Sequence, residues 1–224
     1  MNRLALIHAT RLAIDPIEEA ANALWPEVET ISILEEGLSV DRRKSDALSQ
    51  DLWGRIVSLA GYAESIGAQG ILFTCSAFGQ AIEEAADRAS VPVMKPNEAM
   101  FDAAFAHGDR VAMIYTFQPA ASGMEEEFRE AARARGSAAQ IASVFCAGAM
   151  DAKRNGDIAT HDRLIAETAA AVENADVILL AQFSMASAVD AARRRTALPV
   201  LTSPEAAITE MKRRVETCRE RTAC

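Results

Sequence analysis

Short apolar runs alternate with longer segments of helical periodicity along the chain. The runs predict β-strands near residues 4–8, 29–34, 70–73 and 91–94, and again near 111–115, 140–145, 177–180 and 199–201. Since these runs are apolar throughout rather than alternating with polar residues, they are typical of parallel strands buried on both faces. The segments between them carry helical patterns, so the chain predicts an α/β architecture.

The pattern occurs twice. The stretch "ILFTCSAFGQAIEEAADRASVPVMKPNEA", which starts at Ile71, aligns without a gap with "ILLAQFSMASAVDAARRRTALPVLTSPEA", which starts at Ile178. Pro92 then matches Pro199, and the strands and helices of the two stretches coincide at an offset of 107 residues. The chain is therefore predicted to hold two copies of one α/β unit.

The repeat divides the chain into two domains. We expect an N-terminal domain of residues 1–96 plus 205–224, in which an amphipathic last helix returns to the first copy, and a C-terminal domain of residues 97–204. Asn97 and Ser203 are predicted to cap the helices that follow them. Both domains are predicted to be pseudo-symmetric, doubly wound and flavodoxin-like, each with a parallel four-stranded sheet.

Charge and hydropathy exclude two classes of partner. The 224 residues carry a formal net charge of −9, with acidic and basic residues mixed along the chain. No basic face is available for a phosphate backbone, so we expect no nucleic acid partner. The apolar runs are too short to cross a bilayer, and the first apolar run, interrupted by His8, predicts a strand rather than a signal peptide.

Cysteine and histidine spacing argues against disulfides and metals. Cys75, Cys146, Cys218 and Cys224 form no close pair, so we expect a reduced, cytoplasmic setting. The three histidines lie far apart and show no metal-ligand spacing. No phosphate-binding glycine motif is present either. We therefore expect an enzyme without a metal or an organic cofactor.

Polar residues gather where the predicted strands end. Ligands of parallel sheets bind outside the carboxyl ends of the strands, and two facing sheets would bring those ends into one interdomain cleft, where we expect the active site. Hydroxyl groups there can donate to a carboxylate, and a cleft amide can hold an oxyanion. Arg11 either pairs with a substrate carboxylate or is a surface charge. The candidate substrate-binding residues are Thr10, Arg11, Ser76, Thr116, Gln118 and Ser184.

Cys75 and Gln182 occupy the same place in the two copies. Cys75 ends a strand and precedes the helix "FGQAIEEAADRA", whose amides can stabilise a thiolate or a substrate carboxylate. A buried core cysteine is the structural alternative. Gln182 cannot exchange a proton at neutral pH and can only orient or hydrogen-bond. Its structural alternative is a hydrogen bond across the domain interface.

The motifs "TCSAFG", "LLAQFSMA", "HAT" and "YTFQ" resemble those of the aspartate/glutamate racemase superfamily, which includes hydantoin racemases, maleate isomerases and arylmalonate decarboxylases. The resemblance implies a small carboxylate substrate, contacts to it from "HAT" and "YTFQ", and a homodimer. It also implies two facing cysteines, one of which removes a proton while the other returns one. Gln182 departs from that pattern, because it stands where the second cysteine is expected.

We therefore predict a cysteine-dependent, cofactor-independent enzyme that transfers a proton at the carbon beside a carboxylate or carbonyl, racemase-like and with the first cysteine alone retained. The alternatives are a decarboxylase or other lyase that uses Cys75 as single acid, base or nucleophile, and a non-catalytic ligand-binding relative. Cys146, Glu35, Glu36 and, with less support from its place inside a strand, His8 are candidates to replace the second cysteine.

Overall fold

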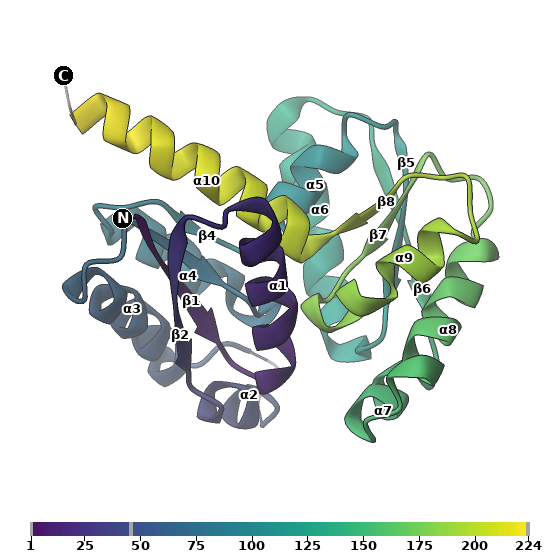
Figure 1. The fold of residues 1–224 in the computed structure, drawn as a ribbon, viewed down its shortest axis with the longest axis horizontal. Helices are drawn as coiled ribbons and strands as arrows, with labels where there is room; N and C mark the ends of the chain where they lie inside the picture. The colour runs from purple at the N-terminus through teal and green to yellow at the C-terminus, as the bar shows by residue number, and fades with distance from the viewer. Residues whose placement is uncertain (1, 45–46, 223–224) are drawn as a thin grey trace. The chain divides into compact units, whose positions relative to one another are not determined.

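Two compact units of similar construction make up the chain. The structure, a computed structural model, describes residues 2–44 and 47–222. One unit runs to Pro96 and resumes at Ala207, and the other runs from Asn97 to Ala206. Figure 1 labels the helices and strands of both. Cys224 lies outside the described residues.

The first unit contains a parallel sheet with the strand order β2-β1-β3-β4. Its strands are β1 (Asn2–His8), β2 (Val28–Leu34), β3 (Gly70–Phe73) and β4 (Val93–Met94). Its helices are α1 (Ile14–Leu24), α2 (Gly37–Arg42), α3 (Gln50–Ser65) and α4 (Gly79–Arg88), with 3-10 turns η1 (Arg11–Ala13) and η2 (Ser76–Phe78). The central strand β3 is buried along its whole length, which explains its uninterrupted apolar run.

Helices cover both faces of the first sheet. Helices α3 and α4 pack on the face that carries Phe73 (Figure 1). The other face receives α10 (Ser203–Thr222). A Cβ atom on Gly70 would lie 2.7 Å from Met211 Sδ and 2.9 Å from Val215 Cγ2. Glycine at this position therefore lets α10 approach the strand closely.

The second unit repeats the arrangement with the strand order β6-β5-β7-β8, all parallel. Its strands are β5 (Arg110–Tyr115), β6 (Gln140–Phe145), β7 (Val177–Leu180) and β8 (Val200–Thr202). Its helices are α5 (Glu98–Ala104), α6 (Ala121–Arg135), α7 (Ala149–Arg154), α8 (Ile158–Ala170) and α9 (Val189–Arg193), with 3-10 segments η3 (Gln118–Ala120) and η4 (Phe183–Ala188).

The second sheet is also covered on both faces (Figure 1). Helices α5 and α6 pack on the face that carries Met113, where the rings of Phe101 and Phe128 meet edge to face with centroids 5.5 Å apart. Helices α8 and α9 pack on the face that carries Ile114. The predicted α/β fold with two parallel four-stranded sheets is confirmed.

The two sheets share one register. In the first unit Leu4 pairs with Gly70, and in the second Val111 pairs with Val177, which is the same pair displaced by 107 residues. The outer strands β4 and β8 keep this offset, because their pairing to β3 and β7 matches in the same way. The sequence repeat is therefore a repeat of backbone hydrogen bonding.

The loops before β3 and β7 repeat as well. Gly67 has a φ of 83°, and its counterpart Asn174 has a φ of 56°, the one positive value among the described non-glycine residues. Asparagine tolerates this left-handed conformation better than most residues. A shared tight turn therefore survives a change of residue.

Two predicted helix caps are wrong. Asn97 precedes α5, but its side chain makes no capping hydrogen bond. Its Oδ1 accepts a hydrogen bond of 2.8 Å from the hydroxyl of Ser203, which is also directed to the sulfur of Met100. Helix α10 begins at Ser203 itself. Both side chains are buried and bond to each other rather than to the helix ends, and the Asn97 Nδ2 has no hydrogen-bond partner among the described residues.

Candidate active site

Cys75 stands where β3 passes into a helix. The N–H of Thr74 donates to the carbonyl of Ile7 over 3.0 Å, which continues the sheet one step beyond β3. Cys75 keeps an extended backbone, with φ −127° and ψ 122°, and the turn η2 and helix α4 follow. Its side chain is partly exposed. The thiol is therefore held at the carboxyl end of a central strand, where parallel sheets bind their ligands.

The surroundings of Cys75 act on its proton in opposite directions. Burial raises the pKa of the thiol, whereas a hydrogen bond from the backbone of Ala77 and the positive charge of Arg42 lower it. Burial dominates, so the pKa lies above its ordinary value. Cys75 is consequently a neutral thiol at rest. The stabilised thiolate expected from its place at a helix start is not the resting form.

Arg42 is a site residue that the sequence prediction missed. It is the last residue of α2, and its Nε donates a hydrogen bond of 3.2 Å to the carbonyl of Ala77. The available signal was the basic pair at 42–43, which lies at the end of the short helix after β2. That signal is weak, because basic residues are common at helix ends.

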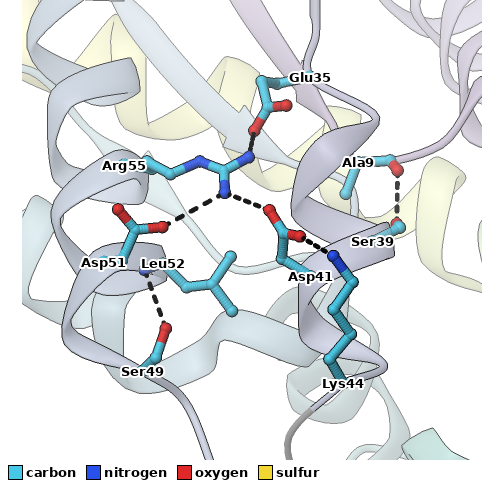
Figure 2. A network of polar contacts seen from close by, with 9 residues as sticks. All are labelled: Ala9, Glu35, Ser39, Asp41, Lys44, Ser49, Asp51, Leu52 and Arg55. Atoms are coloured by element: carbon cyan, nitrogen blue, oxygen red, sulfur yellow. Dashed lines mark hydrogen bonds and ion pairs between the residues drawn. The ribbon is translucent and has the colours of Figure 1, made fainter.

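Arg55 organises the residues around α2, as Figure 2 shows. Its guanidinium pairs with Glu35, with Asp41 over 2.8 Å and with Asp51 over 3.5 Å. Lys44 also binds Asp41 over 2.8 Å. The carboxylate of Glu35 is thus engaged by an arginine, which makes it a poor substitute for the second catalytic group.

Arg11 and Glu36 pair with each other. The Arg11 Nη2 lies 2.9 Å from Glu36 Oε2, and Nε donates to the same carboxylate, so the contact is bidentate. Both side chains are exposed. In this structure Arg11 therefore has the contacts of a surface charge, which was one of the two predicted alternatives. Nearby, Thr10 accepts a hydrogen bond of 3.4 Å from the N–H of Leu12, and Ser76 opens η2 as a partly buried residue.

His8 lies in the core rather than at the site. Its Nδ1 is 2.9 Å from Thr74 Oγ1 and its Nε2 is 3.2 Å from Ser32 Oγ, which in turn donates to Glu18 over 2.7 Å. Burial lowers the pKa of His8 to about 4. A fully buried, neutral imidazole with both nitrogens bonded is a structural residue and not a second base.

Gln182 is fixed by Thr116 in the second unit. Its Oε1 accepts from the N–H of Thr116 over 2.9 Å and from the Thr116 hydroxyl over 3.1 Å. With Oε1 so occupied, Nε2 is buried and has no partner among the described residues. The side-chain oxygen of Gln182 is thus bound inside its own unit. The Thr116 hydroxyl, predicted to donate to a substrate, donates to Gln182 instead.

The second unit holds two further candidates for substrate binding and one candidate for the second base. Gln118 opens η3 as an exposed residue, and Ser184 is buried within η4. Cys146 follows β6 and is buried, with the Thr168 hydroxyl 3.2 Å from its sulfur. Burial raises the pKa of Cys146, so it is a weak candidate for a second base.

A cavity of about 690 Å³ opens beside Cys146, between α8 and the strands β5 and β6. Cys146 and Thr168 are among its lining residues, and the other residues that line it are mainly apolar.

Within residues 2–44 and 47–222, no cluster of histidine, cysteine or carboxylate side chains could hold a metal ion. In the same ranges no helix is long and apolar enough to cross a membrane.

The family model described as Asp/Glu/hydantoin racemase matches residues 9–211. The chain belongs to this family. The match covers both units, including the strand ends that carry Cys75 and Gln182. A comparison with curated protein sequences found no match.

Solved structures of two racemases and a decarboxylase have the same fold as this chain. A glutamate racemase from Bacillus anthracis superimposes with a TM-score of 0.76 at 10% identity, covering 96% of this chain and 82% of the other. An allantoin racemase from Klebsiella pneumoniae gives 0.69 at 16% identity, with 97% and 89% covered. A cysteine-for-glycine mutant of arylmalonate decarboxylase gives 0.68 at 17% identity, with 96% and 93% covered. These racemase and decarboxylase structures therefore share the fold of this chain.

Proposed function

We propose that this protein is a cofactor-independent enzyme that transfers a proton at the carbon beside a carboxylate or carbonyl group of a small acid. Cys75 carries the proton. The observation that best supports this role is the setting of its sulfur, which is partly exposed at the end of a central strand, with the Ala77 amide and the Arg42 charge acting on it. Family membership supports the same class of chemistry.

A neutral thiol acts first as an acid. Because the pKa of Cys75 is raised, its sulfur holds the proton at neutral pH. In the proposed reaction a carboxyl group leaves as carbon dioxide, and the electron pair of the broken C–C bond passes into an enediolate. The proton of Cys75 then goes to the carbon, and the thiolate regains a proton from water. A neutral Cys75 thiol therefore supports a decarboxylase or related lyase that delivers the proton to one face of the substrate carbon.

Gln182 supplies hydrogen-bond donors where a second thiol would stand. Thr116 fixes its amide oxygen, which leaves the amide N–H groups as the free end of the side chain. Donors aimed at developing negative charge stabilise an oxyanion strongly. We propose that Gln182 donates to an enediolate oxygen, and that Thr10, Ser76, Gln118 and Ser184 hold other substrate oxygens.

Racemisation is the second candidate, favoured by the racemases among the solved relatives. It requires a second proton carrier. Gln182 cannot serve as one, Glu35 and Glu36 are both paired with arginines, and Cys146 is buried. For this reason the one-sided reaction is the better-supported proposal.

Isotope incorporation separates these functions. The protein is incubated in deuterated water with aspartate, glutamate, allantoin and an arylmalonate, while NMR follows deuterium at the α-carbon and a second assay measures carbon dioxide. The proposal expects carbon dioxide release from the malonate and deuterium on one face of the product. Exchange with inversion on the other substrates would establish a racemase instead. Binding without exchange or carbon dioxide release would identify a ligand-binding protein and overturn the proposal.

A further inference from the structure

The peptide groups around Ala77 connect Arg42 to Cys75. The Ala77 carbonyl accepts a hydrogen bond of 3.2 Å from Arg42 Nε, and the Ala77 backbone is also hydrogen-bonded to the Cys75 sulfur. The turn η2, which contains Ala77, is therefore held from α2 while it holds the thiol. If the Arg42 side chain moved away, the Ala77 carbonyl would lose its hydrogen bond. The Ala77 amide would then no longer be held in place against the Cys75 sulfur.

Helix α2 is itself anchored on several sides. Its own residue Leu38 is buried in the core, and its Asp41 pairs with Arg55 of α3 over 2.8 Å. The Ser39 hydroxyl donates to the carbonyl of Ala9, just after β1, and Arg55 also binds Glu35 at the end of β2 (Figure 2). A short helix with these anchors holds its last residue in a defined place. The carboxylates of Glu35 and Asp41 are meanwhile engaged by Arg55.

We propose that Arg42 is a positioning residue for Cys75: it fixes the Ala77 turn that binds the sulfur, and it places a positive charge beside the thiolate that remains after proton transfer. Only the second half of this inference depends on the proposed function. In that step the S–H bond breaks, the proton goes to the substrate carbon, and the sulfur keeps the electron pair. The new negative charge then faces the guanidinium and the amide.

Alkylation of Cys75 tests the inference without a substrate. Iodoacetamide labelling is followed against pH, with peptide mass spectrometry to distinguish Cys75 from the other cysteines. For Arg42→Ala we expect the midpoint to move upward by about one pH unit, so that labelling near pH 8 slows by about tenfold. Arg42→Lys keeps a charge without the planar fork, and its midpoint should lie between those of Arg42→Ala and the wild type.

The matched control is Arg43→Ala, which removes an exposed charge one residue away. Its midpoint should equal that of the wild type. Circular dichroism establishes that each variant is folded, and Arg42→Gln replaces Arg42→Ala if the latter is not. Equal midpoints for the position 42 and 43 variants would overturn the inference, even in an active enzyme. The other outcome is that the alkylation midpoint shifts in the Arg42 variants while the wild type catalyses no reaction of the tested acids. That result would uphold the inference and reject the proposed function.

Discussion

The carboxyl ends of the two sheets have the same backbone but differ in the groups that act on the matching residues Cys75 and Gln182. In the first unit the positive charge of Arg42 acts on Cys75. In the second unit Gln182 is bound to the neutral Thr116, and the basic end of the equivalent helix α7 reaches η4 through a hydrogen bond from Lys153 to Ser187. In the proposed mechanism the first strand end moves a proton and the second donates fixed hydrogen bonds.

The second strand of each unit repeats the contrast. Glu35 and Cys146 are equivalent, because the N–H of Glu35 donates to the carbonyl of His8 and that of Cys146 donates to the carbonyl of Tyr115. Glu35 is the partner of Arg55, whereas Cys146 accepts from the neutral hydroxyl of Thr168. Duplication therefore kept the backbone and left the side chains at strand ends to diverge.

Replacing the thiol should have the largest effect on this contrast. Cys75→Ala removes the only proposed proton carrier, so kcat should fall by about 10² to 10⁴ in the reaction that the isotope assay identifies. Cys146→Ala is the matched control, since this buried thiol should change kcat by less than about twofold. Steady-state kinetics of both variants decide the matter. Equal rates for Cys75→Ala and the wild type would remove Cys75 from the mechanism.

The strand ends were predictable because they follow from local pattern. Apolar runs and the gap-free offset define where β3 and β7 stop, and so place Cys75 and Gln182 at equivalent positions. The partners of those residues depend on tertiary contacts. Thr116 lies 66 residues before Gln182, and Arg42 lies 35 residues before Ala77.

The direction of the Cys75 pKa shift was not predictable either. The helix start and its amides indicate a lowered pKa, and the Ala77 hydrogen bond does act in that direction. The opposing desolvation depends on how Cys75 packs against the core of the first unit, which no local pattern records. The sequence pattern therefore predicts where Cys75 lies, whereas its pKa depends on side-chain contacts and packing.

His8 has no imidazole counterpart in the second unit, because its twin position is Tyr115. Burial lowers the pKa of His8 from 6.5 to about 4, so the unfolded chain takes up a proton below pH 6.5 that the folded chain does not. The free energy of unfolding should therefore fall as the pH drops from 6.5 to 4, by about 3 kcal/mol from this group. Urea unfolding at pH 7.5 and 4.5 should show a smaller difference in His8→Gln than in the wild type.

The control for this prediction is His107→Gln, which replaces an exposed histidine. It should lose as much stability on acidification as the wild type. Carboxylates with lowered pKa values also destabilise the fold at low pH, but they contribute alike to all three proteins. An unchanged acid sensitivity in His8→Gln would mean that the imidazole is accessible to protons in the folded state.

The smallest expected effect lies at the strand end that carries Gln182. Thr116→Val keeps the shape of the side chain but removes the hydroxyl that holds Gln182, so kcat should fall by about three- to tenfold, the value of one neutral hydrogen bond. Thr168→Val is the matched control, because Thr168 binds Cys146 and should leave kcat unchanged. If Thr116 acts through Gln182, adding Thr116→Val to Gln182→Leu should cost nothing further. Additive losses would instead mean that Thr116 contacts the substrate directly, and the two strand ends would then differ less than their side chains indicate.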